Sequence, residues 1–403
     1  MTESYIYMDY AATAWKKPQA VIRAVTEALE NGSGNPGRGG HAVSLAAGRL
    51  VDEARQAAAR LIGAGRNDHV IFTSSATEGL NTAIMGIAGG IAAPGRSLDG
   101  MHVICSSMEH NSVARPLEYL KSLGAEVTVI PVDIDEGVDP EMVQKAINGR
   151  TRLVVMNGVS NVTGTVNSVG EMGHICRRAG IPFLVDGSQM AGAFPVDVAA
   201  MEIDLLAFPG HKSVLGPQGT GILYIRPGIP LEPLKRGGTG SMSESLAQPE
   251  LFPDRFESGT LNVPGIAGLG VAAKFIMREG VKNIGEREQK IAEYMAEELK
   301  KMDGIIVYAP RRGCRRGAVF SFNIAGQDPQ DVAMILDQEF GIAVRGGLHC
   351  APLMHQAMGT LENGGAVRVS PGYDTSWEEA ETALNAIREI AGHGAACPAG
   401  QLK

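Results

Sequence analysis

The sequence predicts an α/β fold with a large, mainly parallel sheet and a smaller α+β domain. Short apolar runs alternate with helical patterns down to residue 225, as in βαβ units that place helices on both faces of a parallel sheet. After residue 225 the chain becomes rich in Gly, Pro and Ser, and a long helical pattern with short strands follows. Because 403 residues exceed one ordinary domain, we expect a large domain over 15–265 and a small one over 266–403 that includes residues 1–14.

The elements of the large domain follow from hydrophobic period and from helix and turn signals. Apolar runs predict strands at 70–73, from 103, and at 127–130, 153–156, 183–185, 205–208 and 222–225. Helical patterns predict helices over 44–62 and 171–179. An earlier helix carries Val21, Ile22, Val25 and Leu29 on one face and stops at Asn31-Gly32.

The region after residue 225 predicts the smaller domain. Residues 227–264 are expected to form ordered loops, and one long helix is expected from about 266 to 302. Short strands are predicted at 318–322, 343–345 and 367–370.

Composition limits the kinds of partner. A net charge of −8 without a basic run argues against a nucleic-acid surface. The five cysteines form no C-x-x-C pair, and their odd number fits reduced thiols better than a disulfide framework. No basic, apolar leader and no apolar run of membrane-spanning length is present in the sequence. We therefore expect a cytoplasmic protein without a membrane partner, and we predict no metal site.

Lys212 has an unusual setting for a lysine. It lies between the apolar runs 205–208 and 222–225, just after Gly210-His211. Asp186 ends the run 183–185, and the carboxyl ends of strands are where open α/β sheets bind ligands. A carboxylate for a pyridinium nitrogen and a lysine for a Schiff base are the minimum apparatus for pyridoxal phosphate. Asp and Lys at such spacing also occur by chance.

Two polar motifs follow other predicted strands. Ser75 and Glu78 have capping-box spacing, so the helix that begins there either offers free N–H groups to a phosphate or is simply well capped. His110 follows the strand that begins at 103, and it could lie on a cofactor ring or be a solvated loop histidine.

Two glycine-rich loops are candidate walls of a site. The loop 32–41 contains Arg38 and His41 and is either a mobile wall or a simple connector. The loop 345–352 carries Cys350 among glycines and a proline, beside a histidine and near an arginine. This setting favours a mobile, reactive thiol over a buried and inert one.

Together these motifs resemble the cysteine desulfurases of the class V aminotransferase family, in particular the desulfurases and selenocysteine lyases with a short catalytic-cysteine loop. The resemblance runs from Tyr7 to about residue 390 and rests on motifs in the family's order: Thr77-Glu78 with Asn81, His110, Ser160-Asn161, Asp186-Gly187-Ser188-Gln189, Gly210-His211-Lys212 and Arg345 to Pro352. It implies the aspartate aminotransferase-like fold of pyridoxal phosphate enzymes (fold type I), with a seven-stranded sheet, and a homodimer.

The resemblance also implies a role for each matching residue. Lys212 would bind pyridoxal 5'-phosphate covalently and move the Cα proton, while Cys350 would take the substrate sulfur. His110 would stack on the cofactor ring, Asp186 would pair with its nitrogen, and Gln189 would bond its phenolic oxygen.

The phosphate would be held by the Ala76 backbone, Thr77 and His211, and by Thr260 from a second subunit. The resemblance makes Asn161, Arg345 and Arg368 substrate-binding residues, although Arg368 could equally form a surface ion pair. Arg38 and His41 resemble residues of the family's active-site wall.

The sequence departs from the family at two positions near the phosphate. Pro209 stands where a hydroxyl residue is common and supplies neither a hydroxyl nor an N–H. Ala76-Thr77 replaces two adjacent hydroxyl residues. Both departures imply a phosphate held more by backbone amides and by the second subunit.

The implied activity is removal of sulfur from L-cysteine to give L-alanine and a persulfide on Cys350. An acceptor protein, for example in iron–sulfur cluster assembly, would take the sulfur. A selenocysteine lyase acting on L-selenocysteine, or an aminotransferase with Cys350 as bystander, remains open. A persulfide carrier with little turnover is an alternative of another class, but it would need neither Asp186 nor Lys212.

Overall fold

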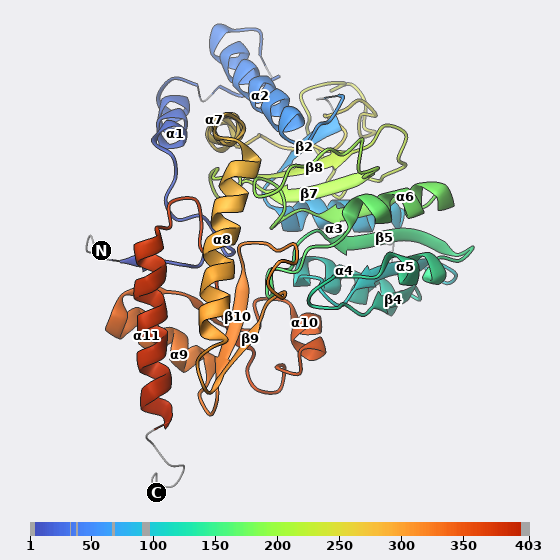
Figure 1. The fold of residues 1–403 in the computed structure, drawn as a ribbon. Coiled ribbons are helices and arrows are strands. Elements are labelled where there is room, and N and C mark those ends of the chain that lie inside the picture. Colours follow the sequence, from blue (N-terminus) through green and yellow to red (C-terminus); the bar gives the residue numbers. More distant parts are fainter. Residues whose placement is uncertain (1–4, 33, 38, 67–68, 91–96, 396–403) are drawn as a thin grey trace, which may run out of the picture.

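The computed structural model describes residues 5–32, 34–37, 39–66, 69–90 and 97–395. In these residues the chain forms a seven-stranded sheet, a four-stranded sheet and one two-stranded pair (Figure 1). The strands of the seven-stranded sheet are β2 (Val70–Thr73), β3 (His102–Ser106), β4 (Glu126–Ile130), β5 (Thr151–Asn157), β6 (Phe183–Asp186), β7 (Leu205–Pro209) and β8 (Gly221–Ile225). The helices in the same part of the chain are α1 (Gln19–Asn31), α2 (Ala42–Leu61), α3 (Ala76–Ile87), α4 (Asn111–Ser122), α5 (Pro140–Ala146), α6 (Val169–Ala179) and α7 (Val263–Glu279).

The seven-stranded sheet has the order β2-β8-β7-β6-β5-β3-β4. Strands β4, β3, β5, β6 and β7 pair in parallel, whereas β8 is antiparallel to both β7 and β2. The connection from β7 to β8 has no crossover helix, and a direct return of this kind gives antiparallel pairing. The predicted, mainly parallel sheet is therefore confirmed, with β8 and β7 as neighbours.

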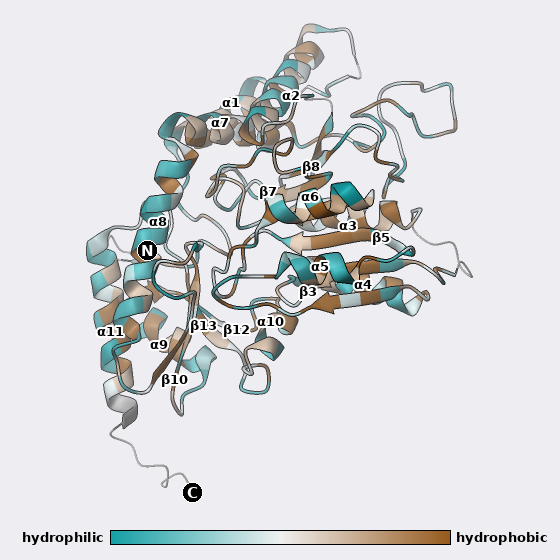
Figure 2. Ribbon diagram, turned by 45° about the vertical axis from the view of Figure 1, so that its right-hand side comes forward, coloured by the Kyte–Doolittle hydropathy of each residue, from teal (hydrophilic) through white to brown (hydrophobic). Residues whose placement is uncertain are grey.

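The strands of this sheet are apolar on both faces, because helices cover both. Alternate side chains point to opposite faces of a strand. In β5, Val154 and Met156 enter one hydrophobic core, and Leu153 and Val155 enter another. Figure 2 shows β5 in brown beside α5 and α6, which carry hydrophilic residues. This explains why the sequence shows continuous apolar runs instead of alternation.

The four-stranded sheet is antiparallel, with the order β12-β13-β10-β9. Its elements are β9 (Ile305–Tyr308), β10 (Phe320–Ile324), β12 (Arg345–Gly347), β13 (Ala366–Val369), α8 (Val281–Leu299), α9 (Pro329–Phe340), α10 (Pro352–Ala357) and α11 (Trp377–Ala395). Helices α8, α9 and α11 pack around this sheet through their own apolar core (Figure 1). The chain start joins this part, because β1 (Ile6–Tyr7) pairs in parallel with β11 (Ile342–Ala343). The exact division into two domains stays a prediction.

Three predictions for this region were wrong in detail. The long helix expected from 266 to 302 is two helices, α7 and α8, because Gly280 between them has a φ of +88° that no α-helix accommodates. The strand expected at 343–345 is split between β11 and β12, and β9 was not predicted. This short strand, Ile305–Tyr308, begins six positions after the last residue of α8, Leu299.

Helix α1 begins and ends close to the predicted positions, but its apolar face is only partly covered. Val21 is buried, whereas Ile22 is 45% exposed. The buried side of α1 packs on α7. Among the described residues, no helix is both long and apolar enough to cross a membrane.

Candidate active site

The site is a cavity of about 220 Å³ at the carboxyl ends of the large sheet's strands. Strands β3, β5, β6 and β7 run in the same direction, and β2 does too because it is antiparallel to β8, which opposes β7. The turns that follow these strands therefore meet at one edge. The sequence-predicted residues that line the cavity are Ala76, Thr77, His110, Asn161, Asp186, Gln189, His211, Lys212, Arg345 and Arg368.

Lys212 carries an amine with no hydrogen bond or ion pair to any described residue. Burial lowers its pKa from 10.5 to about 8, with Arg368 and Arg345 lowering it further and Asp186 and Asp9 opposing them. A lysine with a lowered pKa is neutral more often and is therefore a better nucleophile near neutral pH. The geometry thus fits the predicted role of Lys212 as the residue that bonds a carbonyl cofactor.

His110 and Asp186 face the same cavity as Lys212. His110 caps α4, and its Nδ1 accepts from the Ser112 backbone N–H at 3.0 Å. Burial lowers the pKa of His110 to about 4, so its ring is neutral and its other nitrogen carries the hydrogen. Asp186 is 2% exposed, and its Oδ1 accepts from the Ser188 N–H at 2.9 Å. A neutral ring and a fixed, buried carboxylate suit a flat, cationic heterocycle between them.

Gln189 and His211 are tied to the N-terminal segment that crosses the site. Gln189 Nε2 donates to the Ala11 carbonyl at 2.8 Å. His211 Nδ1 lies 3.0 Å from the Thr13 hydroxyl. Burial lowers the pKa of His211 to about 4. Ala11 and Ala12 of this segment form one wall of the cavity, which the sequence alone did not indicate.

The start of α3 provides a place for an anion. Ser75 caps the helix by accepting from the Glu78 N–H at 3.2 Å, as the capping-box spacing predicted. The Glu78 carboxylate does not return to Ser75, because it accepts from the Ser74 N–H at 2.7 Å and pairs with Lys235 at 2.5 Å. The N–H groups of the first turn have no partner within a helix.

Gly221 allows this helix start to lie close to β8. A Cβ at position 221 would lie 2.6 Å from the Ser75 backbone. Ala76 and Thr77, which form this first turn, line the cavity. This cradle fits a phosphate even though Pro209, also at its edge, offers no donor.

Arg368 is buried and not part of a surface ion pair. It is 1% exposed, and its Nη2 contacts the Asp9 carboxylate at 2.5 Å while Nη1 donates to the Asn161 carbonyl at 3.2 Å. Its Nε and the Asn161 Oδ1 are buried polar atoms without a partner in the described structure. Sequence reasoning missed Asp9, which lies just after β1.

Cys350 lies beside this cavity but is not among its lining residues. Arg345 links the two, because it lines the cavity and its Nη2 lies 3.7 Å from Cys350 Sγ. The Cys350 carbonyl accepts from the Asn111 N–H at 2.7 Å, so the loop docks at the start of α4 next to His110. Cys350 is partly exposed, as the reactive alternative predicted, and its loop is held by hydrogen bonds to the carbonyls of residues 349 and 350.

Two buried ionisable groups near the site escaped sequence reasoning. Glu109 is fully buried, which raises its pKa to about 8, and its Oε1 accepts from the Asn157 N–H at 3.0 Å. His349 lines the cavity and is 2% exposed. Both stand next to predicted site residues in the sequence, and only their burial in the fold distinguishes them.

Three predicted residues lie away from the cavity or outside the described chain. Thr260 is exposed. His41 caps α2, where its Nδ1 accepts from the Ser44 N–H at 3.3 Å. Arg38 lies outside the described residues. The structure therefore does not bring Thr260 or His41 to Lys212.

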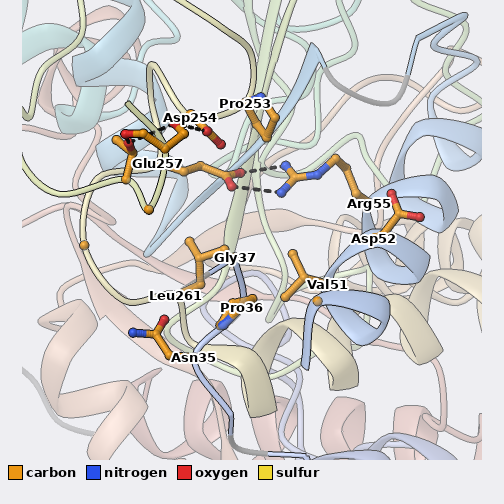
Figure 3. A pocket seen from close by; sticks show the side chains of 15 residues that line it. Asn35, Pro36, Gly37, Val51, Asp52, Arg55, Pro253, Asp254, Glu257 and Leu261 are labelled. Atoms are coloured by element: carbon orange, nitrogen blue, oxygen red, sulfur yellow. Dashed lines mark hydrogen bonds and ion pairs between the residues drawn. The ribbon is translucent and has the colours of Figure 1, made fainter. Parts of the chain in front are cut away.

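A second cavity, of about 330 Å³, lies between α2 and the loops before α7 and is lined on one side by the neighbours of Thr260. Figure 3 shows Arg55 facing Glu257 within it; the two form a bidentate pair at 2.6 and 2.8 Å. Both side chains are buried, and Glu257 also accepts from the Phe72 N–H at 2.7 Å. This pair anchors the loop that carries Thr260 to α2 and β2.

The comparisons with known proteins match nearly the whole chain. The family model for class V aminotransferases matches residues 6–382. A probable cysteine desulfurase of Methanothermobacter thermautotrophicus is 37% identical over 398 residues, which cover 98% of this chain and 96% of the relative. A cysteine desulfurase of Klebsiella pneumoniae is 37% identical over 355 residues, covering 86% of this chain and 85% of that protein.

Solved structures agree with this result. The apo structure of a cysteine desulfurase from Thermococcus onnurineus has a TM-score of 0.89 at 34% identity and covers 96% of this chain and 95% of that one. The cysteine desulfurase CsdA from Escherichia coli has a TM-score of 0.85 at 27% identity, with 98% and 96% of the two chains covered. With its sheet order, its lysine site and these matches, the chain belongs to the class V aminotransferase family.

Proposed function

We propose that the protein is a cysteine desulfurase that uses pyridoxal 5'-phosphate to convert L-cysteine into L-alanine and a persulfide on Cys350. The observation that carries the proposal is one cavity lined by a deprotonable lysine, a buried carboxylate and a buried arginine, with a partly exposed thiol at its edge. The relatives named as cysteine desulfurases support the same reaction.

The residues present fit the cofactor. Lys212 has a free amine, and Asp186 offers a carboxylate for the ring nitrogen. The first turn of α3 and His211 line the place for the phosphate, and the missing Cβ of Gly221 lets that turn lie close to β8. When bound, pyridoxal phosphate would withdraw electrons from the substrate Cα and so weaken its bonds.

The substrate would be oriented by its carboxylate. Arg368 offers its unpartnered Nε, and Asn161 has a second amide hydrogen, because its first donates to the His349 carbonyl at 2.8 Å. Arg345 adds positive charge on the same side. An amino acid held by this end would point its amine toward Lys212 and its Cβ toward the edge at which Cys350 lies.

Two residues would move protons or sulfur. Lys212, once free of the cofactor, would act as the base that takes the Cα proton, which a pKa of about 8 allows near neutral pH. The Cys350 thiolate would bond to the substrate sulfur while the Cβ–S bond breaks. The electron pair of that bond stays on the carbon, which takes up a proton and becomes the methyl group, and Lys212 returns a proton to Cα to complete alanine. The Arg345 guanidinium, whose Nη2 lies 3.7 Å from Sγ, would donate a hydrogen bond to that sulfur.

We also propose that the enzyme is a homodimer in which the partner subunit's Thr260 completes the phosphate site. Thr260 is exposed, although its loop is anchored by the buried pair of Arg55 and Glu257. Large apolar side chains nearby are exposed too: Met242 at 46%, Leu246 at 108% and Leu251 at 63%. A second copy is the simplest cover for such a surface.

The product persulfide requires an acceptor, and we propose a sulfur-acceptor protein such as one of iron–sulfur cluster assembly. The site is equally suited to L-selenocysteine. A cytoplasmic location, which reduced cysteines favour, belongs to the same proposal.

The proposal is tested with the holoenzyme and L-cysteine under reducing conditions. We expect a visible band of the lysine-bound cofactor and equimolar alanine and sulfide, and, in a parallel sample without reductant, a mass increase of one sulfur on Cys350. Cys350→Ala should keep the band and lose the persulfide, whereas the control Cys314→Ala should behave as wild type. Alanine formation by Cys350→Ala at the wild-type rate would refute the assignment, and dependence on a keto acid would favour an aminotransferase.

A further inference from the structure

Two neighbouring residues of the Cys350 loop adopt an unusual backbone conformation. His349 has a φ of +52° and Cys350 a φ of +55°, in the left-handed region that side chains other than glycine rarely adopt. Such a conformation persists only when the surroundings impose it. Two hydrogen bonds to backbone carbonyls contribute, from the Asn161 side chain to residue 349 and from the Asn111 N–H to residue 350.

A line of side-chain hydrogen bonds runs from the same loop into the protein. His349 Nε2 lies 3.0 Å from the Arg345 carbonyl, and His349 Nδ1 lies 3.1 Å from His355 Nε2. His355 Nδ1 lies 2.8 Å from the Thr360 hydroxyl. We call these three residues the histidine chain: Thr360, His355 and His349.

The direction of every bond in the histidine chain is determined. A carbonyl only accepts, so His349 Nε2 carries a hydrogen, and in the neutral ring Nδ1 is then an acceptor. His355 must therefore donate from Nε2 and accept at Nδ1, and the Thr360 hydroxyl must donate to it. The alternative acceptor of that hydroxyl, the His355 carbonyl, is farther away at 3.3 Å.

The surroundings keep both rings neutral, as this arrangement requires. His349, His355 and Thr360 are each at most 2% exposed. Burial lowers the pKa of His355 to about 4 and that of His349 to about 2, and the guanidinium groups of Arg368 and Arg345 act on His349 in the same direction. The far end of the chain, at Thr360, is remote from the reacting atoms, so it can be changed without touching the cavity, which Thr360 does not line.

We propose that the histidine chain is a positioning device that holds Cys350 in its left-handed backbone conformation, so that its sulfur attacks the substrate from a fixed place. This inference rests on the proposed sulfur transfer at Cys350. His349 and His355 are positioning residues here, because each acts on the sulfur through the loop. Thr360 sets the hydrogen-bond direction by donating the first hydrogen.

The first test compares Thr360→Val with Thr360→Ser. Valine keeps the shape of threonine but removes its hydroxyl, whereas serine restores the donor. For Thr360→Val we expect about tenfold slower persulfide formation on Cys350, the factor that one lost hydrogen bond represents. The KM for L-cysteine and the cofactor content should stay at wild-type values, and Thr360→Ser should recover most of the rate. Equal rates in all three proteins, or equal losses in both variants, would overturn the proposal.

A second readout does not depend on turnover. Iodoacetamide alkylation of Cys350, followed by peptide mass spectrometry, should become several-fold faster in Thr360→Val because a released loop exposes the thiol. The partly exposed Cys314 serves as the internal reference. General damage to the fold would accelerate both cysteines, which would count against a specific role.

The tautomers can be measured directly in the wild-type protein, so the test does not depend on a variant that folds. In ¹⁵N-histidine spectra, both residues should be neutral with the hydrogen on Nε2 between pH 6 and 8 (roughly the range around the ordinary histidine pKa). A hydrogen on Nδ1 of either ring would overturn the proposal. If the wild type forms no persulfide, the proposed function fails, while the alkylation and tautomer results still decide whether the chain holds the loop.

Discussion

Replacing Lys212 by methionine should stabilise the cofactor-free protein while abolishing turnover. The structure lowers the pKa of this lysine from 10.5 to about 8, mainly by burial. At about 1.4 kcal/mol for each tenfold change in proton affinity, the charged amine costs roughly 3 kcal/mol of folding free energy at pH 7. Methionine fills a similar volume without a charge, so Lys212→Met should increase the free energy of unfolding by at most that amount.

The stability difference between wild type and Lys212→Met should also change with pH, in a direction that follows from the lowered pKa. The folded-state pKa is below the unfolded one, so between pH 8 and about 10.5 the unfolded chain binds more protons, and wild-type stability rises with pH. Below pH 8 the amine is charged in both states and the cost is complete. The advantage of Lys212→Met should therefore be largest at pH 7 and shrink toward pH 10.

The measurement is urea unfolding of the two apoproteins at pH 7 and pH 10. Lys282→Met is the matched control, because its side chain is 75% exposed on α8 and its removal should change stability by less than about 0.5 kcal/mol at either pH. A Lys212→Met protein that is less stable than wild type at pH 7, or an advantage that does not depend on pH, would refute the reasoning.

Three further substitutions test other parts of the structure. Glu257→Ala leaves Arg55 buried without its partner and should lower the free energy of unfolding by about 3–5 kcal/mol. The control Glu250→Ala removes a side chain that is 84% exposed and should change that free energy by less than about 0.5 kcal/mol. Equal effects of the two substitutions in urea titrations would contradict the importance of the buried pair. Gly280→Ala places a Cβ at a φ of +88° and should cost about 1–2 kcal/mol, visible as a lower Tm; an unchanged Tm would count against the break between α7 and α8. Arg368→Lys keeps the charge but loses the planar donor pair, so steady-state kinetics should give a KM for L-cysteine at least about tenfold higher; an unchanged KM would remove Arg368 from the carboxylate site.

Much of the fold was predictable because burial on both faces leaves a strong local signal. Strands such as 70–73 and 205–208 appear in the sequence as apolar runs, and the structure places β2 and β7 there. The end of α1 was marked by the turn residues Asn31-Gly32. Where the local signal was weak, prediction failed: a single glycine at 280 did not show that the helical pattern on its two sides belongs to different helices.

The sequence predicted which residues form the candidate site, but not how they are arranged in space or which other residues they contact. Residues after separate strands, such as His110, Asp186 and Lys212, were identified from their local contexts, and a parallel sheet brings such turns to one edge. Asp9 is different, because it meets Arg368 only through the pairing of β1 with β11 and the bridge between Asp9 and Ser370. No local pattern reports a contact between residues more than 350 positions apart.

The sequence by itself determined the type of fold, the family and the chemistry-bearing side chains, because these depend on hydrophobic period, turn residues and short motifs. Only the tertiary structure decided which of those side chains are buried, and therefore how they ionise. The lowered pKa values of Lys212 and His349 both arise from loss of water and from the nearby Arg345 and Arg368, which reach Lys212 from the four-stranded sheet. Desolvation and electrostatic interaction act through distances in space, which a sequence does not contain until it has folded.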